Sequence, residues 1–196
     1  MPQLIASLWL FLIALMVGHS AHAASIDYFA YLDGASESPP NGSPGTGFGH
    51  VAYDSIAHTL LVHIDFTGLS GVTTVSHLHC CTASPDTGTA GVATQTPTFA
   101  GFPAGVTSGT YENTFDLTFA SSWNGAFITA NGGTAAGAEA AFAEGLNTGR
   151  VYLNIHTSLY QGGEIRGFLH QVPEPATIAL LGIGLVGLAR RQRASA

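Results

Sequence analysis

The stretch His58–Thr67, which reads HTLLVHIDFT, decides the fold class of this chain. Four of its apolar residues, Leu60, Val62, Ile64 and Phe66, stand at every second position. Successive side chains of an extended chain point to opposite faces, so these four share one face and the polar residues His63, Asp65 and Thr67 share the other. The pattern predicts a β-strand with one buried face.

The same period of two recurs on both sides of this stretch. We expect further strands near residues 26–32, 47–53, 72–79, 114–119, 151–156 and 164–170. The last two flank Gln161-Gly162-Gly163, which is typical of a hairpin turn. Short strands separated by Gly, Pro, Ser and Asn predict an all-β fold, an antiparallel β-sandwich.

One segment favours a helix instead. Residues 135–146 are rich in alanine and glutamate and run into the turn Asn147-Thr148-Gly149, so they predict one short helix. Residues 82–110 are rich in Thr, Gly and Pro and show no period, and we expect a loop excursion there.

The composition narrows the class of protein. Of the 196 residues 46% are hydrophobic and 9% are charged, with five arginines, no lysine and 12 acids. So apolar a chain is not disordered, and a net charge of -7 provides no phosphate-neutralising surface. We therefore expect no nucleic-acid partner.

The N-terminus has the layout of a secretory signal peptide. An apolar run, residues 4–17, precedes the small-residue triplet Ala21-His22-Ala23, so we expect residues 1–23 to be removed. No Lys or Arg precedes the run, and a retained anchor helix is the alternative. Residues 24–171 then form one domain of ordinary size, which holds 11 of the 12 acids and two of the five arginines.

The C-terminus, residues 172–196, forms a third unit. The motif Pro173-Glu174-Pro175 precedes an apolar run at 176–189 and the basic residues Arg190, Arg191 and Arg193. A helix over the run would be about 21 Å long, short for a bilayer core of about 30 Å. We expect a short transmembrane helix with its arginines in the cytoplasm.

This C-terminal unit closely resembles the PEP-CTERM sorting signal of exported bacterial proteins. The resemblance implies recognition by an exosortase-type membrane protease, removal of the tail, and delivery to the cell surface or an exopolysaccharide matrix. A plain C-terminal anchor behind an incidental Pro-Glu-Pro linker is the alternative.

Pieces of the middle region are similar to the CHRD domain, a module named after its repeats in chordin. They are Glu37-Ser38-Pro39-Pro40, Gly45-Thr46-Gly47, the run at 66–71, Ser76-His77-Leu78-His79, the run at 152–157 and the run at 162–167. Their order and number carry the resemblance, which implies an all-β extracellular module and no established reaction. Family members commonly continue the His-x-His pair with Gly-Pro, whereas Cys80-Cys81 follows here.

Three histidines form a candidate metal site. His77 and His79 lie two apart in an expected strand, so their imidazoles share a face, and His156 ends another expected strand. If the two strands are neighbours, the three imidazoles can bind Zn²⁺ or Cu²⁺. The alternative is that they only form hydrogen bonds within the sheet or to a loop.

The two cysteines, Cys80 and Cys81, are adjacent, which leaves three possibilities open. They can form a vicinal disulfide, although adjacent Cα atoms lie closer than a disulfide usually spans. Cys81 can instead complete the metal site, if the strand continues past His79 and places its thiolate on the same face. Pairing between molecules is the third possibility.

No catalytic constellation is visible. The chain has no nucleophile motif and no paired carboxylates, and Glu164 and Arg166 are expected to form a surface ion pair. We therefore expect a non-enzymatic, exported module with a structural or adhesive role. The alternative is a metal-binding protein that uses the histidine cluster for Cu or Zn, and a polysaccharide-binding module is a third possibility.

Overall fold

The computed structural model describes residues 25–171, and the expected signal peptide and sorting tail lie outside this range. Its elements are the strands β1 (Ile26–Asp33), β2 (Thr46–Asp54), β3 (Thr59–Thr67), β4 (Thr73–His79), β5 (Gly109–Asp116), β6 (Tyr152–Thr157), β7 (Ile165–Phe168) and β8 (His170–Gln171), and the helices η1 (Ala120–Ser122), α2 (Gly125–Ala130) and α3 (Ala135–Asn147). The expected strands all appear, and the segment expected at 114–119 is shifted to β5.

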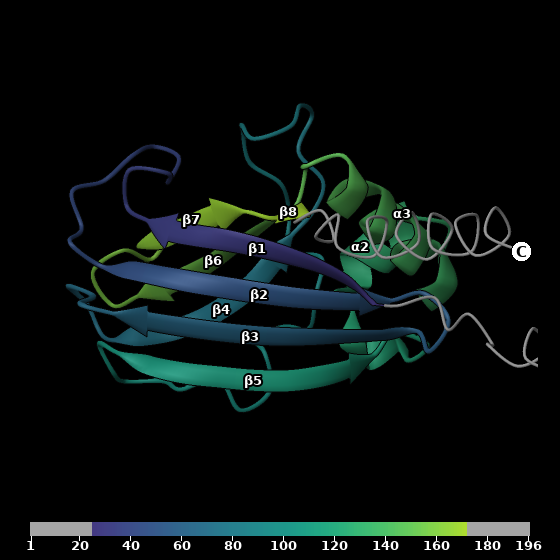
Figure 1. The fold of residues 1–196 in the computed structure, drawn as a ribbon, viewed down its shortest axis with the longest axis horizontal. Helices are drawn as coiled ribbons and strands as arrows, with labels where there is room; N and C mark the ends of the chain where they lie inside the picture. Colours follow the sequence, from purple (N-terminus) through teal and green to yellow (C-terminus); the bar gives the residue numbers. More distant parts are fainter. Residues whose placement is uncertain (1–24, 172–196) are drawn as a thin grey trace, which may run out of the picture.

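The strands form one curled antiparallel sheet in the order β4-β6-β7-β1-β2-β3-β5, with β8 paired to β1. In Figure 1, β1, β2, β3 and β5 lie in front while β4, β6 and β7 lie behind them. The mostly-β, antiparallel prediction is confirmed, but a sandwich of two separate sheets is wrong. We call β1, β2, β3 and β5 one wall of the curled sheet, and β4, β6 and β7 the other wall. β1 joins the two walls, because Asp33 pairs with Arg166 of β7 and Tyr28 pairs with Gln171 of β8.

The two walls pack against each other inside the curl, around a core that includes Leu32, Ile64 and Leu153. A Cβ atom at Gly49 of β2 would lie 2.6 Å from Leu153 Cδ2, and one at Gly47 would lie 3.2 Å from Ile165 Cδ1. The missing side chains therefore let β2 approach the opposite wall closely.

The segment between β4 and β5 covers the free edge of β4. Backbone N–H groups of Ala93, Phe99 and Gly105 donate to carbonyls of β4, at 2.9, 3.2 and 2.9 Å. Phe99 is fully buried, and its ring stacks on Tyr111 of β5 at a centroid distance of 5.7 Å. The loop excursion predicted from the composition is thus a packed closure of the sheet.

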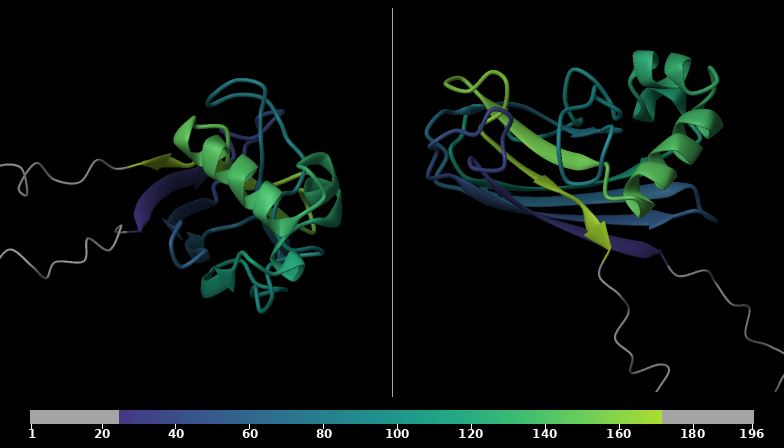
Figure 2. Two further views of the ribbon diagram at one scale, coloured as in Figure 1. Left: turned by 90° about the vertical axis from the view of Figure 1, so that its right-hand side faces the viewer. Right: turned by 90° about the horizontal axis from the view of Figure 1, so that it is seen from above.

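Two α-helices lie at one end of the curled sheet (Figures 1 and 2), where the sequence predicted one. The predicted helix is α3, and Thr134 caps it by accepting a hydrogen bond from Gly137 N at 3.0 Å. The unpredicted helix α2 is six residues long, too short to show a helical period, and packs Phe127 against Trp123.

Residues 25–171 carry their own hydrophobic core, since 28 buried apolar residues of this range form one cluster. No helix within these residues has the length and apolar character needed to cross a bilayer. We treat residues 24–171 as a unit that can be studied separately.

Candidate metal centre

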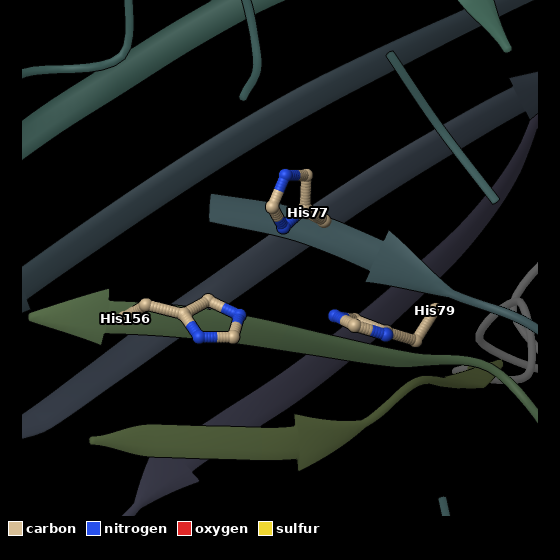
Figure 3. A group of neighbouring side chains, drawn as sticks. All are labelled: His77, His79 and His156. Atoms are coloured by element: carbon tan, nitrogen blue, oxygen red, sulfur yellow. The ribbon is translucent and has the colours of Figure 1, made fainter. Parts of the chain in front are cut away.

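The three candidate histidines lie on neighbouring strands. β4 and β6 pair antiparallel, with His77 opposite Asn154 and Val75 opposite His156. Because alternate residues share a face, Leu78 points into the core while His77 and His79 project from the other side. Figure 3 shows the three rings turned toward one another from the two strands.

The rings converge closely enough to share one ion. One ring nitrogen from each of His77, His79 and His156 lies within 4.8 Å of the others. Ring centroids are 5.7 Å apart for His77 and His156, and 5.8 Å apart for His77 and His79. The structure therefore brings the three predicted residues together.

A backbone carbonyl holds the other nitrogen of each ring. His77 Nε2 lies 2.6 Å from Pro97 O, and His79 Nδ1 lies 2.9 Å from Ala90 O. His156 Nδ1 lies 2.8 Å from the carbonyl oxygen of residue 161. A carbonyl only accepts, so each of these nitrogens carries the proton and the opposite nitrogen keeps its lone pair.

The three lone pairs have no hydrogen-bond partner among the described residues. They belong to His77 Nδ1, His79 Nε2 and His156 Nε2, all buried from solvent. Buried polar atoms are nearly always paired, so three orphans beside one another are unusual. A metal-bound histidine typically has this arrangement, with its second nitrogen donating to a carbonyl.

The surroundings keep the imidazoles neutral. Burial lowers the pKa of all three rings, although the carbonyl contacts oppose this effect. The pKa of His79 falls to about 4, and its ring stacks on Tyr152 at a centroid distance of 4.7 Å. Neutral imidazole is the form that binds a metal ion.

Comparison with known families now identifies the module. The CHRD domain family matches residues 28–169, which is most of the chain. This chain belongs to the CHRD domain family. The PEP-CTERM protein-sorting motif matches residues 171–194, and it implies processing by an exosortase, export and sorting to the cell surface. No curated protein and no solved structure matches the chain.

A buried polar network adjoins the imidazoles of this CHRD domain. Asn154 Nδ2 donates to Glu37 Oε1 at 2.6 Å, while Asn154 Oδ1 is buried without a partner among the described residues. Arg166 Nε lies 3.9 Å from Glu37 Oε2, and its guanidinium stacks over Tyr152 at 4.8 Å. Burial raises the pKa of Glu37 to about 7, against the lowering effect of Arg166.

The surface ion pair expected between Glu164 and Arg166 is wrong, because both residues of the CHRD domain are buried. Glu164 accepts hydrogen bonds from the hydroxyls of Ser43 and Thr157 and from the backbone N–H groups of residues 70 and 71. Burial raises the pKa of Glu164, but the combined effect of these four hydrogen bonds is larger and opposite. The pKa of Glu164 is therefore lowered. Strand alternation cannot reveal that a loop covers a polar face.

The two cysteines of the CHRD domain lie away from the imidazoles. Cys80 and Cys81 form a disulfide with each other. Cys81 Sγ lies 3.5 Å from Ala141 O of α3, and β4 ends at His79, so the strand alternation does not carry Cys81 onto the imidazole face. The structure thus brings three of the four predicted ligands together and leaves Cys81 packed against α3.

The other histidines of the described CHRD domain each lie beside a carboxylate. His50 lies beside Asp27, His58 beside Glu139, and His170 beside Asp86. His63 lies between two carboxylates, Asp65 and Glu112. None of them belongs to a second group of three potential ligands in residues 25–171.

Proposed function

We propose that this exported CHRD domain binds one divalent transition-metal ion, Zn²⁺ or Cu²⁺, through His77, His79 and His156. The observation that carries the proposal is the set of three buried, unpartnered ring nitrogens facing a common centre. Each ring is already fixed in the required tautomer by a loop carbonyl.

The spacing suits such an ion after a small adjustment. Zinc–nitrogen bonds of about 2.0 to 2.1 Å in tetrahedral geometry place two ligand nitrogens about 3.4 Å apart. The nitrogens here lie within 4.8 Å of one another. The rings must therefore close by at most about 1.4 Å, which side-chain rotation can supply.

The donor set selects the class of metal. The described group offers three imidazoles and no carboxylate or thiolate. Imidazole suits zinc and copper, whereas calcium and magnesium prefer oxygen ligands. The alternative, in which the histidines serve only as hydrogen-bonding residues, accounts for one nitrogen of each ring and leaves three buried lone pairs without a partner.

The metal would have a structural effect in this proposal. It would tie β4 to β6 at the place where backbone carbonyls of the segment between β4 and β5 contact the imidazoles of His77 and His79. We propose a non-enzymatic, structural or adhesive role at the cell surface or in an exopolysaccharide matrix, because the PEP-CTERM motif directs the chain to the surface.

Metal analysis and calorimetric titration of residues 24–171 test the proposal. We expect one equivalent of Zn²⁺ or Cu²⁺ per chain, and binding weakened by more than about 100-fold in His77→Ala and His79→Ala, since the loss of a ligand exceeds the loss of its supporting contact. His170→Ala, an exposed histidine outside the group, should leave the affinity unchanged. Absence of bound metal would contradict the proposal, and so would an affinity that is unchanged in His77→Ala.

A further inference from the structure

The outer face of β1, β2, β3 and β5 carries an ordered array of side chains on the opposite side of the strands from the core. The registers of the three strand pairs align two rows across the sheet. The first row is Tyr31, Phe48, Asp65 and Thr110, and the second row is Phe29, His50, His63 and Glu112. Phe29, Tyr31 and Phe48 stand on β1 and β2, whereas the carboxylates Asp65 and Glu112 stand on β3 and β5.

The aromatic half of this array is open to solvent. Tyr31 is 79% exposed, and Phe29 and Phe48 are partly exposed. The rings contact one another, with centroids 5.4 Å apart for Tyr31 and Phe48 and 5.6 Å apart for Phe29 and Phe48. A group of exposed aromatic rings on a sheet usually marks an interaction site.

An open hollow of about 480 Å³ lies along the first row. Its lining combines Tyr31 and Phe48 with the polar residues Thr46, Asp65 and Thr110. Gly47 and Gly109, whose Cβ positions face the core, also line it. The hollow thus has an apolar wall and a hydrogen-bonding wall.

The hydrogen-bonding wall is already organised. Asp65 Oδ1 accepts from Thr110 Oγ1 at 2.6 Å, and Asp65 Oδ2 lies 3.0 Å from His63 Nε2. The hydrogen bonds from Thr110 and His63 lower the pKa of Asp65, so it stays a carboxylate near neutral pH. Each carboxylate oxygen keeps a further lone pair for a ligand hydroxyl.

We infer that this face binds a neutral polysaccharide, with sugar rings stacked on Tyr31 and Phe48 and their hydroxyls donating to Asp65. A sugar ring has an apolar C–H face and polar hydroxyl edges, and the array offers an apolar half and an acceptor half in the same order. The four strands span about 14 Å between the outermost two, enough for a short run of sugar rings.

The charges select this ligand over other polymers. The array holds two carboxylates, Asp65 and Glu112, and no Lys or Arg, on a chain of net charge -7. An anionic polysaccharide or an anionic lipid surface would be repelled. The inference does not depend on the metal centre, which lies on β4 and β6 in the other wall.

Affinity electrophoresis of residues 24–171 tests the inference. Native gels would contain hydroxyethylcellulose, galactomannan or dextran as neutral probes and alginate as the anionic probe. We expect at least one neutral polymer to retard the protein and alginate not to retard it. Tyr31→Ala and Phe48→Ala should weaken the retardation at least about tenfold in apparent affinity.

Two controls keep the result decisive. Phe119→Ala removes an aromatic ring that is 60% exposed but lies outside the array, and it should leave the retardation unchanged. Circular dichroism should show that Tyr31→Ala folds, since that side chain is mostly exposed. Migration unaffected by all three neutral polymers, retardation by alginate alone, or retardation that survives both aromatic substitutions would each overturn the inference.

Discussion

Saturating the three-imidazole centre with zinc should raise the thermal stability of the domain. An ion that binds the folded chain and not the unfolded chain stabilises the fold by mass action. The centre joins two strands that are distant in sequence, since His77 and His79 lie on β4 and His156 lies on β6. Unfolding separates these strands, so the site exists only in the folded protein.

The expected shift in Tm follows from the zinc concentration relative to the Kd and from the size of the domain. At a free zinc concentration of about 100 times the Kd, the stabilisation is about 2.7 kcal/mol. For a domain of about 150 residues, each kcal/mol shifts Tm by about 3 °C. The expected rise in Tm is therefore about 8 °C for the wild-type domain, measured by circular dichroism after chelator treatment and again after zinc addition.

His156→Ala is the most informative variant for this measurement. The side chain is partly exposed, so its removal costs less packing than removal of a buried residue while it takes away one ligand. The zinc-dependent rise should shrink to less than about 2 °C in this variant, whereas His170→Ala should keep the full rise. An equal rise in His156→Ala and the wild type would refute the assignment of the site.

Three further predictions concern the polar network and the helix packing. Glu164→Gln places amide hydrogens against existing donors and should destabilise the fold by about 2 to 4 kcal/mol in denaturant titrations, while the exposed Glu144→Gln should be nearly neutral. The pKa of Glu37 is raised from 4.5 to about 7, so the folded state keeps a proton that the unfolded state releases in that window. Glu37 should therefore contribute a downward slope to the free energy of unfolding from about pH 4.5 to 7, and the difference between the wild type and Glu37→Gln across this range should show that contribution. Gly145→Ala puts a Cβ atom 2.5 Å from a cysteine Sγ and should lower stability by about 1 to 3 kcal/mol in thermal melts, whereas Gly125→Ala meets nothing within 4 Å and should not.

Much of the fold could be predicted because its strands bury one face. The alternation of Leu60, Val62, Ile64 and Phe66 identifies β3 directly, and it confirms that local periodicity is a sufficient signal for such a strand. The curl of the sheet has no local signal, since a sandwich and a curled sheet bury one face in the same way. The link between the walls depends on a pairing between β1 and β7, whose residues lie far apart in the sequence.

The candidate metal centre could likewise be predicted only in part from the sequence. The shared face of His77 and His79 follows from alternation alone, whereas the approach of His156 depends on the register between β4 and β6. The roles of Glu37 and Asn154 could not be predicted, because Glu37 lies in a loop and its contact with Asn154 joins positions 117 residues apart. A buried loop contact leaves no period in the sequence.

The beginning of β1 and the end of β8 lie side by side, as the pairing of Tyr28 with Gln171 shows and as the right-hand view of Figure 2 displays. Because these two ends of the CHRD domain are so close together, a circularly permuted form of residues 25–171 is feasible. A short peptide could connect the two ends, and the exposed Gly132-Gly133 turn could be opened to create new termini. Such a rearranged gene product would retain every strand pairing, and it would allow the sheet to be displayed from its helical end.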